Sequence, residues 1–442
     1  MDKKLLFSVS GLRGIVNESL DIPAVVKYTE AFIRYTNGDV YAVAQDTRPH
    51  SLAIRKAVIS TILACGKEVI DLGVVPTPTL LYFVRTKRLS GGIMITASHN
   101  PIEWNALKFV NSHGMFIDAN DVKKIEEIAN SKPKWCKFWE FKPLRTNTNA
   151  INDHINAILE HPLVKVKEIR RKGFTVVCDC INGAAYEAIP LLLEKLGCRV
   201  VKLNCDDSGD FVRNPEPKKE YLGELEDLLF SEDADVAFAT DPDGDRLVVG
   251  VRNIGILSEE YTVPLAAYHV LNYKKGDIVV NFSTSMMIED IARIFKVNVH
   301  RSPVGEANVV SLIKEKNAVF GGEGNGGVIF PEINPARDSL TGIALILSLM
   351  AEDEINEVLS KIPKYFMVKK RIEWNGELPQ QKLKAEFKNF DFNELDGIYF
   401  RRRKEWVHIR KSNTEPIVRI YAEAESEGDA LKLVARALKV FE

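Results

Sequence analysis

Three aspartates alternate with other residues in a short loop and could bind a divalent cation. Asp241, Asp243 and Asp245 lie in the segment DPDGDR, between two apolar segments with the pattern of strands. Three like charges in a tight loop repel one another unless a positive charge compensates them. Three carboxylates also leave coordination positions for a phosphate oxygen and water, as Mg²⁺ usually requires. We therefore predict a Mg²⁺ site; an EF-hand calcium loop would need glycine and glutamate where Arg246 and Arg252 stand.

A serine follows another apolar segment in the sequence TASHNP, residues 96–101. Gly92–Ile95 is expected to form a strand, and a small loop at a strand end would expose Ser98 as a nucleophile. Serine is also common in ordinary polar turns, and no histidine and aspartate at a recognisable spacing complete a hydrolase triad. Lys108 would reach the same site if the chain turns back after the loop.

A glycine-rich loop and an arginine-rich loop occur later in the chain. Gly321–Gly327 contains the spacing G-x-G-x-x-G, but a strand-like segment follows it where a dinucleotide site requires a helix. Its carboxylate and amide, Glu323 and Asn325, better suit hydrogen bonds to sugar hydroxyls. The segment RKSNTEP, residues 410–416, with Arg419 beyond it, offers two arginines, two hydroxyls and turn N–H groups. These groups suit a phosphate-binding loop, although a charged hairpin turn has the same pattern in isolation.

The composition is that of a soluble globular protein with several domains. A chain of 442 residues exceeds what one hydrophobic core usually organises. The 59 Lys and Arg residues nearly balance the 61 Asp and Glu residues, so nothing in the charge favours nucleic acid or an anionic membrane as a partner. The amino end is too short and charged for a signal peptide, and the longest apolar stretch is far below the ~20 residues of a membrane span. The expected location is the cytoplasm, and the sequence gives no indication of an oligomeric state.

Strands and helices alternate along most of the chain, which predicts α/β domains. Tyr41–Ala44 and Glu68–Leu72 have the pattern of strands around a helix at Leu52–Ala64, and Trp406–Arg410 has the pattern of a strand near the carboxyl end. The basic, proline-containing residues 131–148 lack apolar periodicity and are expected to connect domains. Four domains fit best, with the ranges 1–146, 147–250, 251–364 and 365–442.

Six cysteines are scattered along the chain without the regular spacing of a disulfide framework. Cys178 and Cys180 form C-x-C in an apolar run with the pattern of a strand, so alternation places both on one face. Free cysteine in that setting usually behaves as a small buried hydrophobe. Because no second Cys or His pair sits nearby in the sequence, we expect core residues and not a metal site.

Taken together, the loops resemble those of the α-D-phosphohexomutase family, which includes phosphoglucomutase, phosphomannomutase and phosphoglucosamine mutase. The similarity covers essentially the whole chain in order. It comprises SGLRG at Ser10–Gly14, TASHNP at Thr96–Pro101, NPEP at Asn214–Pro217, DPDGDR at Asp241–Arg246, GEGNGG at Gly322–Gly327 and RKSNTEPIVR at Arg410–Arg419. The resemblance implies four domains around a central cleft: three related α/β domains, each a mixed sheet with flanking helices, and a smaller C-terminal α+β domain.

The resemblance also implies a catalytic centre. Ser98 would carry a phosphoryl group beside a Mg²⁺ ion. The ligands of that ion would be the phosphorylated serine, Asp241, Asp243 and Asp245. The groups around the transferring phosphoryl group would be Arg13, Lys108 and His99.

The substrate would be held by other motifs of the family. Arg246 would line the site, and Glu323 and Asn325 would contact sugar hydroxyls. The phosphate that is not being transferred would be held by a loop whose residues are Arg410, Ser412, Asn413, Thr414 and Arg419.

The reaction that the resemblance implies moves a phosphoryl group between two positions of a sugar. Phospho-Ser98 would donate to the free hydroxyl of a glucose, mannose or glucosamine monophosphate, and the resulting 1,6-bisphosphate would turn end for end and return its other phosphoryl group. Such transfer needs alignment and charge neutralisation, which a metal ion and cationic side chains supply. The alternatives are a catalytically silent sugar-phosphate-binding or regulatory protein and a sugar phosphatase.

Three positions depart from the family's pattern, and the first is Asn325, which stands where many members have serine in the sugar loop. Many members end the sugar loop with histidine where this chain has Gly327, so the resemblance assigns no general base there. Ala106 stands where glycine is common, which is tolerable if its φ angle is negative. The motifs do not distinguish between the sugars, because Glu323 would contact hydroxyls that these sugars share.

Overall fold

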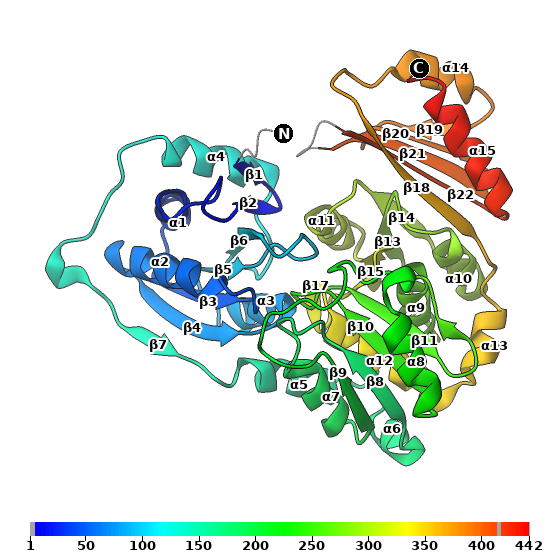
Figure 1. Ribbon diagram of the computed structural model, residues 1–442, viewed down its shortest axis with the longest axis horizontal. Coiled ribbons are helices and arrows are strands. Elements are labelled where there is room, and N and C mark those ends of the chain that lie inside the picture. Colours follow the sequence, from blue (N-terminus) through cyan, green and yellow to red (C-terminus); the bar gives the residue numbers. More distant parts are fainter. Residues whose placement is uncertain (1–4, 413–416, 442) are drawn as a thin grey trace. The chain divides into compact units, whose positions relative to one another are not determined.

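The computed structural model describes residues 5–412 and 417–441 of the chain. These residues form two compact units. The first unit comprises Met1–Thr262 and Gly326–Glu352, and the second comprises Val263–Asn325 and Asp353–Glu442. Both units are built from sheets with packed helices (Figure 1).

A seven-stranded mixed sheet organises the N-terminal part of the first unit, in the order β1-β2-β6-β5-β3-β4-β7. Strands β5, β3, β4 and β7 are parallel, and β6, β2 and β1 continue the sheet with antiparallel pairings. Helices α1, α2 and α4 share one hydrophobic core with the sheet, and α3 packs on β3 and β5. The bounds are β1 Leu6–Ser8, β2 Gly11–Ile15, α1 Ile22–Thr36, β3 Val40–Gln45, α2 Ser51–Ala64, β4 Glu68–Val74, α3 Thr77–Thr86, β5 Gly91–Ile95, β6 Trp104–Asn111, α4 Ala119–Ala129 and β7 Leu144–Thr146.

A second sheet in the same unit has the order β12-β11-β10-β8-β9. Strands β10, β8 and β9 are parallel, whereas β11 and β12 pair antiparallel. Helix α8 packs on β8, β10 and β11, and α7 packs on β8 and β9. The bounds are α5 Ala150–Glu160, α6 Val166–Lys172, β8 Thr175–Asp179, α7 Ala188–Lys195, β9 Arg199–Leu203, α8 Gly223–Ser231, β10 Val236–Thr240, β11 Leu247–Val251 and β12 Gly255–Ile256.

Residues Gly326–Glu352 complete the first unit with an antiparallel hairpin and a buried helix. The hairpin is β16, Gly327–Phe330, with β17, Asn334–Arg337, and the helix is α12, Ser339–Glu352. The carboxylate of Asp338 accepts from the N–H groups of Leu340 and Thr341 at 3.1 and 3.2 Å. This cap satisfies donors at the start of a helix whose first thirteen residues are all buried.

The second unit contains a parallel sheet and an antiparallel sheet. Strands β14, β13 and β15 are parallel, and α11 packs on all three. The C-terminal sheet has the antiparallel order β18-β22-β21-β20-β19, with α14 and α15 on one core. The bounds are α9 Thr262–Tyr273, β13 Ile278–Asn281, α10 Met287–Phe295, β14 Val299–Ser302, α11 Glu306–Lys316, β15 Phe320–Glu323, α13 Ile355–Ser360, β18 Phe366–Glu373, α14 Gln380–Glu386, β19 Asp391–Asn393, β20 Ile398–Arg402, β21 Glu405–Lys411, β22 Ile417–Ala424 and α15 Glu427–Leu438.

Most of the predicted elements are confirmed, but the segment that was expected to connect domains also contains a strand. The predicted strands at Tyr41–Ala44 and Glu68–Leu72 lie within β3 and β4. Within residues 131–148, however, β7 pairs in parallel with β4, with Leu144 opposite Val69. All three residues of β7 are exposed, so the segment carries no apolar periodicity that would indicate a strand.

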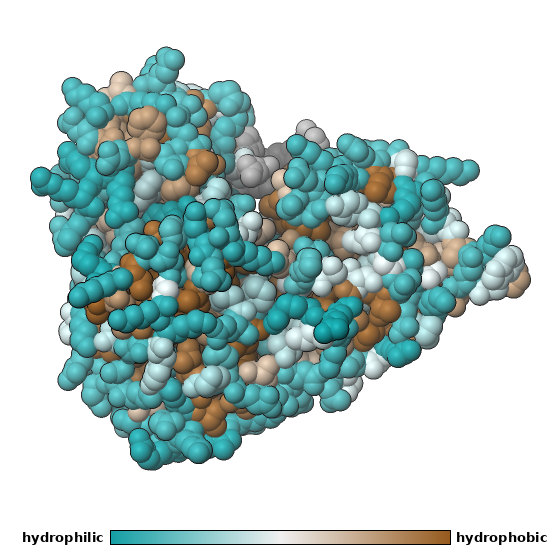
Figure 2. Space-filling view, turned by 180° about the vertical axis from the view of Figure 1, so that it is seen from behind, coloured by the Kyte–Doolittle hydropathy of each residue, from teal (hydrophilic) through white to brown (hydrophobic). Residues whose placement is uncertain are grey.

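The apolar side chains are buried mainly between the sheets and the helices that pack on them. In the described parts of the chain, no helix combines the length and apolar character needed to cross a bilayer. Hydrophilic residues cover most of the face seen in Figure 2, where hydrophobic residues form separate patches. The larger buried clusters lie between the sheets and their helices.

Candidate active site

The predicted nucleophile lies in a loop after a strand that is buried along its whole length, β5. Ser98 is only 3% exposed, and its φ angle is 50°, in the left-handed region that serine rarely adopts. The Ser98 N–H donates to Thr96 Oγ1 at 2.9 Å, and Arg48 donates to the Ser98 carbonyl oxygen at 2.9 Å. Local strain of this kind, held by surrounding contacts, clusters at functional sites.

The three aspartates project from a loop after β10, which is also buried throughout. Asp241, Asp243 and Asp245 are each 0% exposed, and oxygens from the three carboxylates lie within 4.8 Å of one another. Gly244 makes the turn with a φ of 70°, and a Cβ there would lie 3.2 Å from neighbouring side chains. The Asp245 N–H donates to Asp241 Oδ1 at 3.1 Å. The loop therefore holds three carboxylates close together inside the protein.

The serine loop and the aspartate loop meet, although 143 residues separate Ser98 from Asp241. The Ser98 hydroxyl donates to Asp241 Oδ2 at 2.9 Å. The end of β5 and the end of β10 thus deliver the predicted nucleophile and the predicted metal ligands to one place. Strand ends of α/β sheets are the usual position for such sites.

Cationic side chains pair with the aspartates, and Arg246 Nε lies 3.8 Å from Asp241 Oδ2 and 4.0 Å from Asp245 Oδ1. Lys108 Nζ donates to Asp243 Oδ2 at 2.6 Å and lies 3.9 Å from Asp245 Oδ2. It lies on β6, which runs antiparallel to β5, so the predicted return of the chain is confirmed. Arg337 Nη2 donates to Asp245 Oδ2 at 2.6 Å. Arg337 was not predicted as a site residue, because it lies on β17 outside every recognised motif.

The carboxylates fit a hard cation. Within the described part of the chain, Oδ1 of Asp243 and Oδ1 of Asp245 are buried without a hydrogen-bond partner. Burial, with Asp245 and Asp243 beside it, raises the pKa of Asp241 well above its ordinary value. Burial alone would also raise the pKa of Asp243, but the Lys108 ammonium holds that pKa below its ordinary value. Two partnerless carboxylate oxygens beside a third carboxylate form an oxygen donor set suited to Mg²⁺.

Arg13, His99 and Arg246 lie against the serine loop. Arg13 Nη1 donates to Asn100 Oδ1 at 2.7 Å, and burial together with nearby arginines lowers its pKa to about 10, so it stays a cation at neutral pH. Arg246 Nη2 donates to His99 Nδ1 at 2.8 Å. Burial and the Arg246 charge lower the pKa of His99 well below its ordinary value. His99 is therefore a neutral ring whose Nδ1 is already an acceptor.

Arg48 supports the serine loop, and the recognised motifs did not indicate it. Its side chain is 1% exposed, pairs with Asp46, and donates to the carbonyl oxygens of Ser98 and Asn100 at 2.9 and 2.6 Å. The residue follows β3 in the segment DTR. Polar residues directly after a predicted strand were a usable signal here, as they were for Ser98.

The two polar residues of the predicted sugar loop, Glu323 and Asn325, lie in the second unit. Glu323 ends β15, is 3% exposed, and Oε1 accepts from Asn281 Nδ2 at 2.8 Å and from the Gly305 N–H at 3.0 Å. Asn325 lies two residues further, before β16 begins at Gly327, so the predicted strand–loop–strand pattern is confirmed. Two donors therefore fix the Glu323 carboxylate.

The predicted phosphate loop lies at the end of β21 and the start of β22. Arg410 and Arg419 face each other in the strand register, and the Ser412 N–H donates to the Ile417 carbonyl oxygen at 2.9 Å. Asn413 and Thr414 lie outside the residues that the structure describes.

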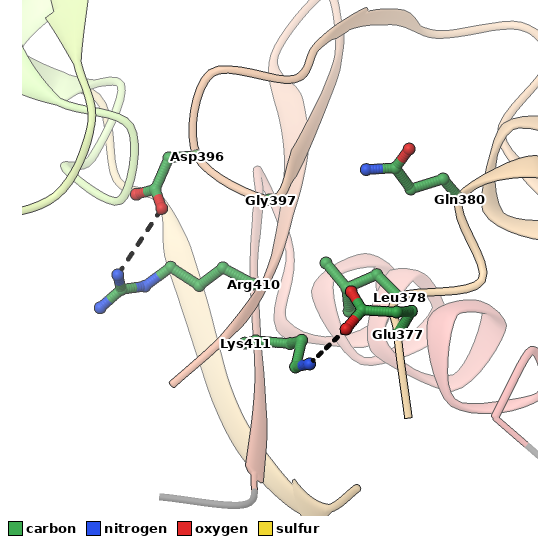
Figure 3. Close-up of a pocket in the computed structure, with 7 residues that line it drawn as sticks. All are labelled: Glu377, Leu378, Gln380, Asp396, Gly397, Arg410 and Lys411. Atoms are coloured by element: carbon green, nitrogen blue, oxygen red, sulfur yellow. Dashed lines mark hydrogen bonds and ion pairs between the residues drawn. The ribbon is translucent and has the colours of Figure 1, made fainter. Parts of the chain in front are cut away.

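A cavity of about 370 Å³ adjoins these strands (Figure 3). Arg410 Nη1 lies 3.7 Å from Asp396 Oδ1, and Lys411 Nζ lies 3.1 Å from Glu377 Oε1. The lining residues are Glu377, Leu378, Gln380, Asp396, Gly397, Arg410 and Lys411. The cavity wall thus carries two cations from the predicted phosphate-binding segment.

Hydrogen bonds connect the sugar loop to this cavity within the second unit. Glu323 accepts from Gly305, and the adjacent Val304 N–H donates to Asp396 Oδ2 at 2.9 Å. Asp396 in turn faces Arg410. The carboxylate proposed to contact a sugar and the arginine proposed to contact its phosphate therefore belong to one connected region.

Four consecutive parts of the chain match one protein family. Residues 4–134, 152–255 and 258–366 match the phosphoglucomutase/phosphomannomutase alpha/beta/alpha domains I, II and III. Residues 373–440 match the C-terminal domain of phosphoglucomutase/phosphomannomutase. The matches bear out the expected series of three α/β domains and a smaller last domain.

Whole proteins are similar along nearly the entire chain. A "Probable phosphoglucosamine mutase" of Methanopyrus kandleri is 35% identical, with 97% of this chain and 95% of that protein covered. A "Phosphoglucomutase/phosphomannomutase" of Thermococcus kodakarensis is 33% identical, with coverages of 99% and 98%. A solved phosphoglucomutase/phosphomannomutase family protein from Burkholderia thailandensis shares the fold with a TM-score of 0.85 at 23% identity, covering 99% of this chain and 96% of that one. Aspergillus fumigatus N-acetylphosphoglucosamine mutase, solved with GlcNAc-6P and magnesium, gives a TM-score of 0.62 at 14% identity, with coverages of 99% and 96%.

Proposed function

Because the chain belongs to the phosphoglucomutase/phosphomannomutase family, we propose that it interconverts the 1-phosphate and 6-phosphate of a hexose or hexosamine through phosphorylated Ser98. The observation that carries this proposal is the 2.9 Å hydrogen bond from the Ser98 hydroxyl to Asp241, inside a cluster of three buried aspartates. An ordinary turn serine has no reason to lie against such a cluster. A phosphoryl carrier does, because the negative charge of its phosphate would be balanced by a metal ion that the aspartates hold.

The first step transfers the phosphoryl group from Ser98 to the sugar. The bond between phosphorus and Ser98 Oγ breaks, a bond between phosphorus and the sugar hydroxyl oxygen forms, and the proton of that hydroxyl is transferred to Ser98 Oγ. The 1,6-bisphosphate then reorients, the bond between its other phosphorus and the sugar oxygen breaks as phosphorus bonds to Ser98 Oγ, and the Ser98 proton is transferred to that sugar oxygen. The serine is thereby phosphorylated again at the end of each cycle.

Charge balance at the site supports this chemistry. Asp241, Asp243 and Asp245 would hold Mg²⁺, which when bound withdraws charge from phosphoryl oxygens. Lys108 and Arg13 are cations beside the serine loop and would orient and neutralise the same group. Arg48 fixes the carbonyl groups of the loop, so that the Ser98 hydroxyl keeps its position while the substrate changes.

Glu323 and Asn325 are the proposed contacts for sugar hydroxyls, and the 410–419 loop is the proposed site for the phosphate that is not transferred. For that loop the proposed contacts are Arg410, Ser412, Asn413, Thr414 and Arg419. A binding loop separate from Ser98 is useful because each phosphate of the bisphosphate must occupy it in turn. The cationic wall formed by Arg410 and Lys411 supports this assignment.

Replacement of Arg410 by alanine is expected to raise KM about 10- to 100-fold for every sugar phosphate that the enzyme uses. The reason is the loss of a charge-assisted hydrogen bond to phosphate, which is common to all of them. Steady-state kinetics with each active sugar measures the effect. Arg402→Ala is the matched control, because Arg402 pairs with Glu405 at the surface of the same sheet. A KM change confined to one sugar would assign Arg410 to sugar recognition instead.

A coupled assay tests the function itself. The purified protein is given the 1-phosphates of glucose, mannose, glucosamine and N-acetylglucosamine, with Mg²⁺ and a trace of the matching 1,6-bisphosphate. We expect the 6-phosphate of at least one sugar to form, with no net release of inorganic phosphate. Release of phosphate without a 6-phosphate would indicate a sugar phosphatase, and binding without any turnover would indicate a silent binding protein.

The cytoplasm is the proposed location, because sugar phosphates are its metabolites and the six cysteines are free thiols. No nucleic acid or membrane partner is proposed.

A further inference from the structure

Three cysteines meet at one edge of the second sheet of the first unit. Cys178 lies near the end of β8, Cys180 follows that strand, and Cys205 follows β9, which is parallel to β8. Their sulfur atoms all lie within 4.8 Å of one another, and the Cys178 and Cys205 sulfurs are 3.9 Å apart. The prediction that Cys178 and Cys180 are buried on one face is confirmed. The third thiol comes from a distant strand end, so the spacing of the C-x-C motif alone did not indicate it.

The arrangement has the dimensions of a thiolate metal site. Zinc–sulfur bonds are about 2.3 Å long, so two sulfurs on one tetrahedral zinc ion lie about 3.8 Å apart. The observed 3.9 Å separation matches this value without movement of either residue. Soft thiolate ligands select Zn²⁺ and Cu⁺ over Mg²⁺. The aspartate cluster, with oxygen ligands only, has the opposite preference.

The backbone around the thiols is held in an unusual conformation. Ile181, Asn182 and Asn204 have φ angles of 51°, 53° and 50°. Left-handed backbone is costly for a β-branched residue such as isoleucine. Asp179 fixes this conformation, because Oδ1 accepts from the Ile181 N–H at 2.8 Å and from Asn204 Nδ2 at 3.3 Å. Thiols that only fill a hydrophobic core do not require a strained backbone held by hydrogen bonds. A metal site does require its ligand side chains to be held in place before the metal binds.

From these observations we propose that Cys178, Cys180 and Cys205 bind one thiophilic metal ion, Zn²⁺ or Cu⁺. The three sulfurs supply three ligands, and a fourth position on Zn²⁺ is open to water or a small thiol. Cys205 is partly exposed, which gives the ion a route from solvent. The ion has a structural role, because it connects the end of β8 to the end of β9.

The bound ion would also stabilise the region around the aspartate loop. Directly after the thiols, the Ala184 N–H donates to the Pro242 carbonyl oxygen at 2.7 Å, within the aspartate loop. A Cβ at Gly183 would lie only 2.6 Å from that oxygen, so the two segments are in direct contact. Thr47 Oγ1 donates to the Asn182 carbonyl oxygen at 2.6 Å. Metal at the thiols therefore stabilises the segment on which the aspartate loop rests.

The proposal is tested by a Cd²⁺ titration of the reduced, chelator-treated protein. Excess Mg²⁺ is present throughout, so that the aspartates are already occupied. We expect one Cd²⁺ per chain with an ultraviolet sulfur-to-metal charge-transfer band, which binding to carboxylates does not produce. Zn²⁺ and Cu⁺ are then tested separately as competitors for that band, and the ion that displaces Cd²⁺ at the lower concentration is the one that the three thiols bind more tightly. Saturation is expected to raise Tm by at least about 2 °C. The readouts need no enzymatic activity, so the result is independent of the proposed mutase function.

Two variants complete the test. Cys205→Ser is expected to lose the charge-transfer band and to weaken metal binding at least about 100-fold. Cys198→Ser is the control, because Cys198 lies in the same sheet region but outside the cluster, and it should bind the metal as the wild type does. X-ray absorption of the Zn²⁺-loaded wild type should show three sulfur neighbours, which keeps the test valid even if Cys205→Ser fails to fold. Absence of the band, persistence of the band in a folded Cys205→Ser, or fewer than three sulfur neighbours would each overturn the proposal.

Discussion

Replacement of Ser98 by alanine is expected to lower mutase turnover by at least about 10⁴-fold while the protein remains folded. The substitution removes the hydroxyl that is proposed to accept and donate the phosphoryl group. The fold should survive, because serine and alanine share the cost of the left-handed backbone at this residue, and the substitution removes only the hydroxyl's hydrogen bonds to Asp241 Oδ2 at 2.9 Å and to His99 Nδ1 at 3.3 Å. The coupled assay and thermal unfolding measure the two effects.

Ser98→Gly is the matched control for the strained backbone. Glycine adopts a φ of 50° without the steric cost that alanine has, although it also adds freedom to the unfolded chain. We expect it to be as inactive as the alanine variant and no less stable. Intact-mass measurement should detect a phosphoryl group on the wild type after incubation with 1,6-bisphosphate and none on either variant. Turnover within tenfold of the wild type in Ser98→Ala would refute the phosphoserine mechanism.

Local patterns in the sequence predicted the positions of the main site residues well. Ser98 and the aspartates were placed directly after buried strands, and β5 and β10 confirm this placement. Lys108 was expected to reach the site of Ser98 if the chain turned back, and the antiparallel pairing of β6 with β5 brings it to Asp243. These positions could be predicted from the alternation of strands and loops alone, because the loops that follow parallel strands lie at the same edge of a sheet.

Contacts between distant segments were not predictable in the same way. Arg337 reaches Asp245 from a hairpin 92 residues later, and Cys205 reaches Cys178 across a parallel strand pair. Such contacts depend on strand order, which periodicity does not encode. The left-handed conformation of Ser98 was equally unpredictable, since serine has no intrinsic preference for it and hydrogen bonds with Thr96 and with the distant Arg48 help to hold it.

Asparagine substitutions of two neighbouring aspartates are expected to change metal-free stability differently. In Asp243→Asn, the Lys108 ammonium loses its 2.6 Å partner inside the protein, which should cost about 3 kcal/mol of unfolding free energy. In Asp241→Asn, one of three adjacent like charges disappears, and the amide can still accept from the Asp245 and Arg246 N–H groups. The raised pKa of Asp241, caused by burial and by the other two aspartates, shows that its charge is unfavourable without a cation. We therefore expect Asp241→Asn to be as stable as the metal-free wild type or more stable.

Both asparagine variants should nevertheless lose the Mg²⁺-induced rise in Tm and at least about 100-fold in turnover, because each removes a proposed metal ligand. Thermal unfolding in chelator and then in a Mg²⁺ titration separates the two effects. The double variant Asp243→Asn with Lys108→Met isolates the buried pair: removing both charges should restore much of the metal-free stability without restoring turnover. If Asp241→Asn and Asp243→Asn instead lost equal stability in chelator, the aspartates would be structural ligands of their neighbouring cations, and the metal assignment would fail. If both kept the full Mg²⁺-induced rise in Tm, the ion would bind elsewhere, since a site of three carboxylates does not tolerate the loss of one without a change in affinity.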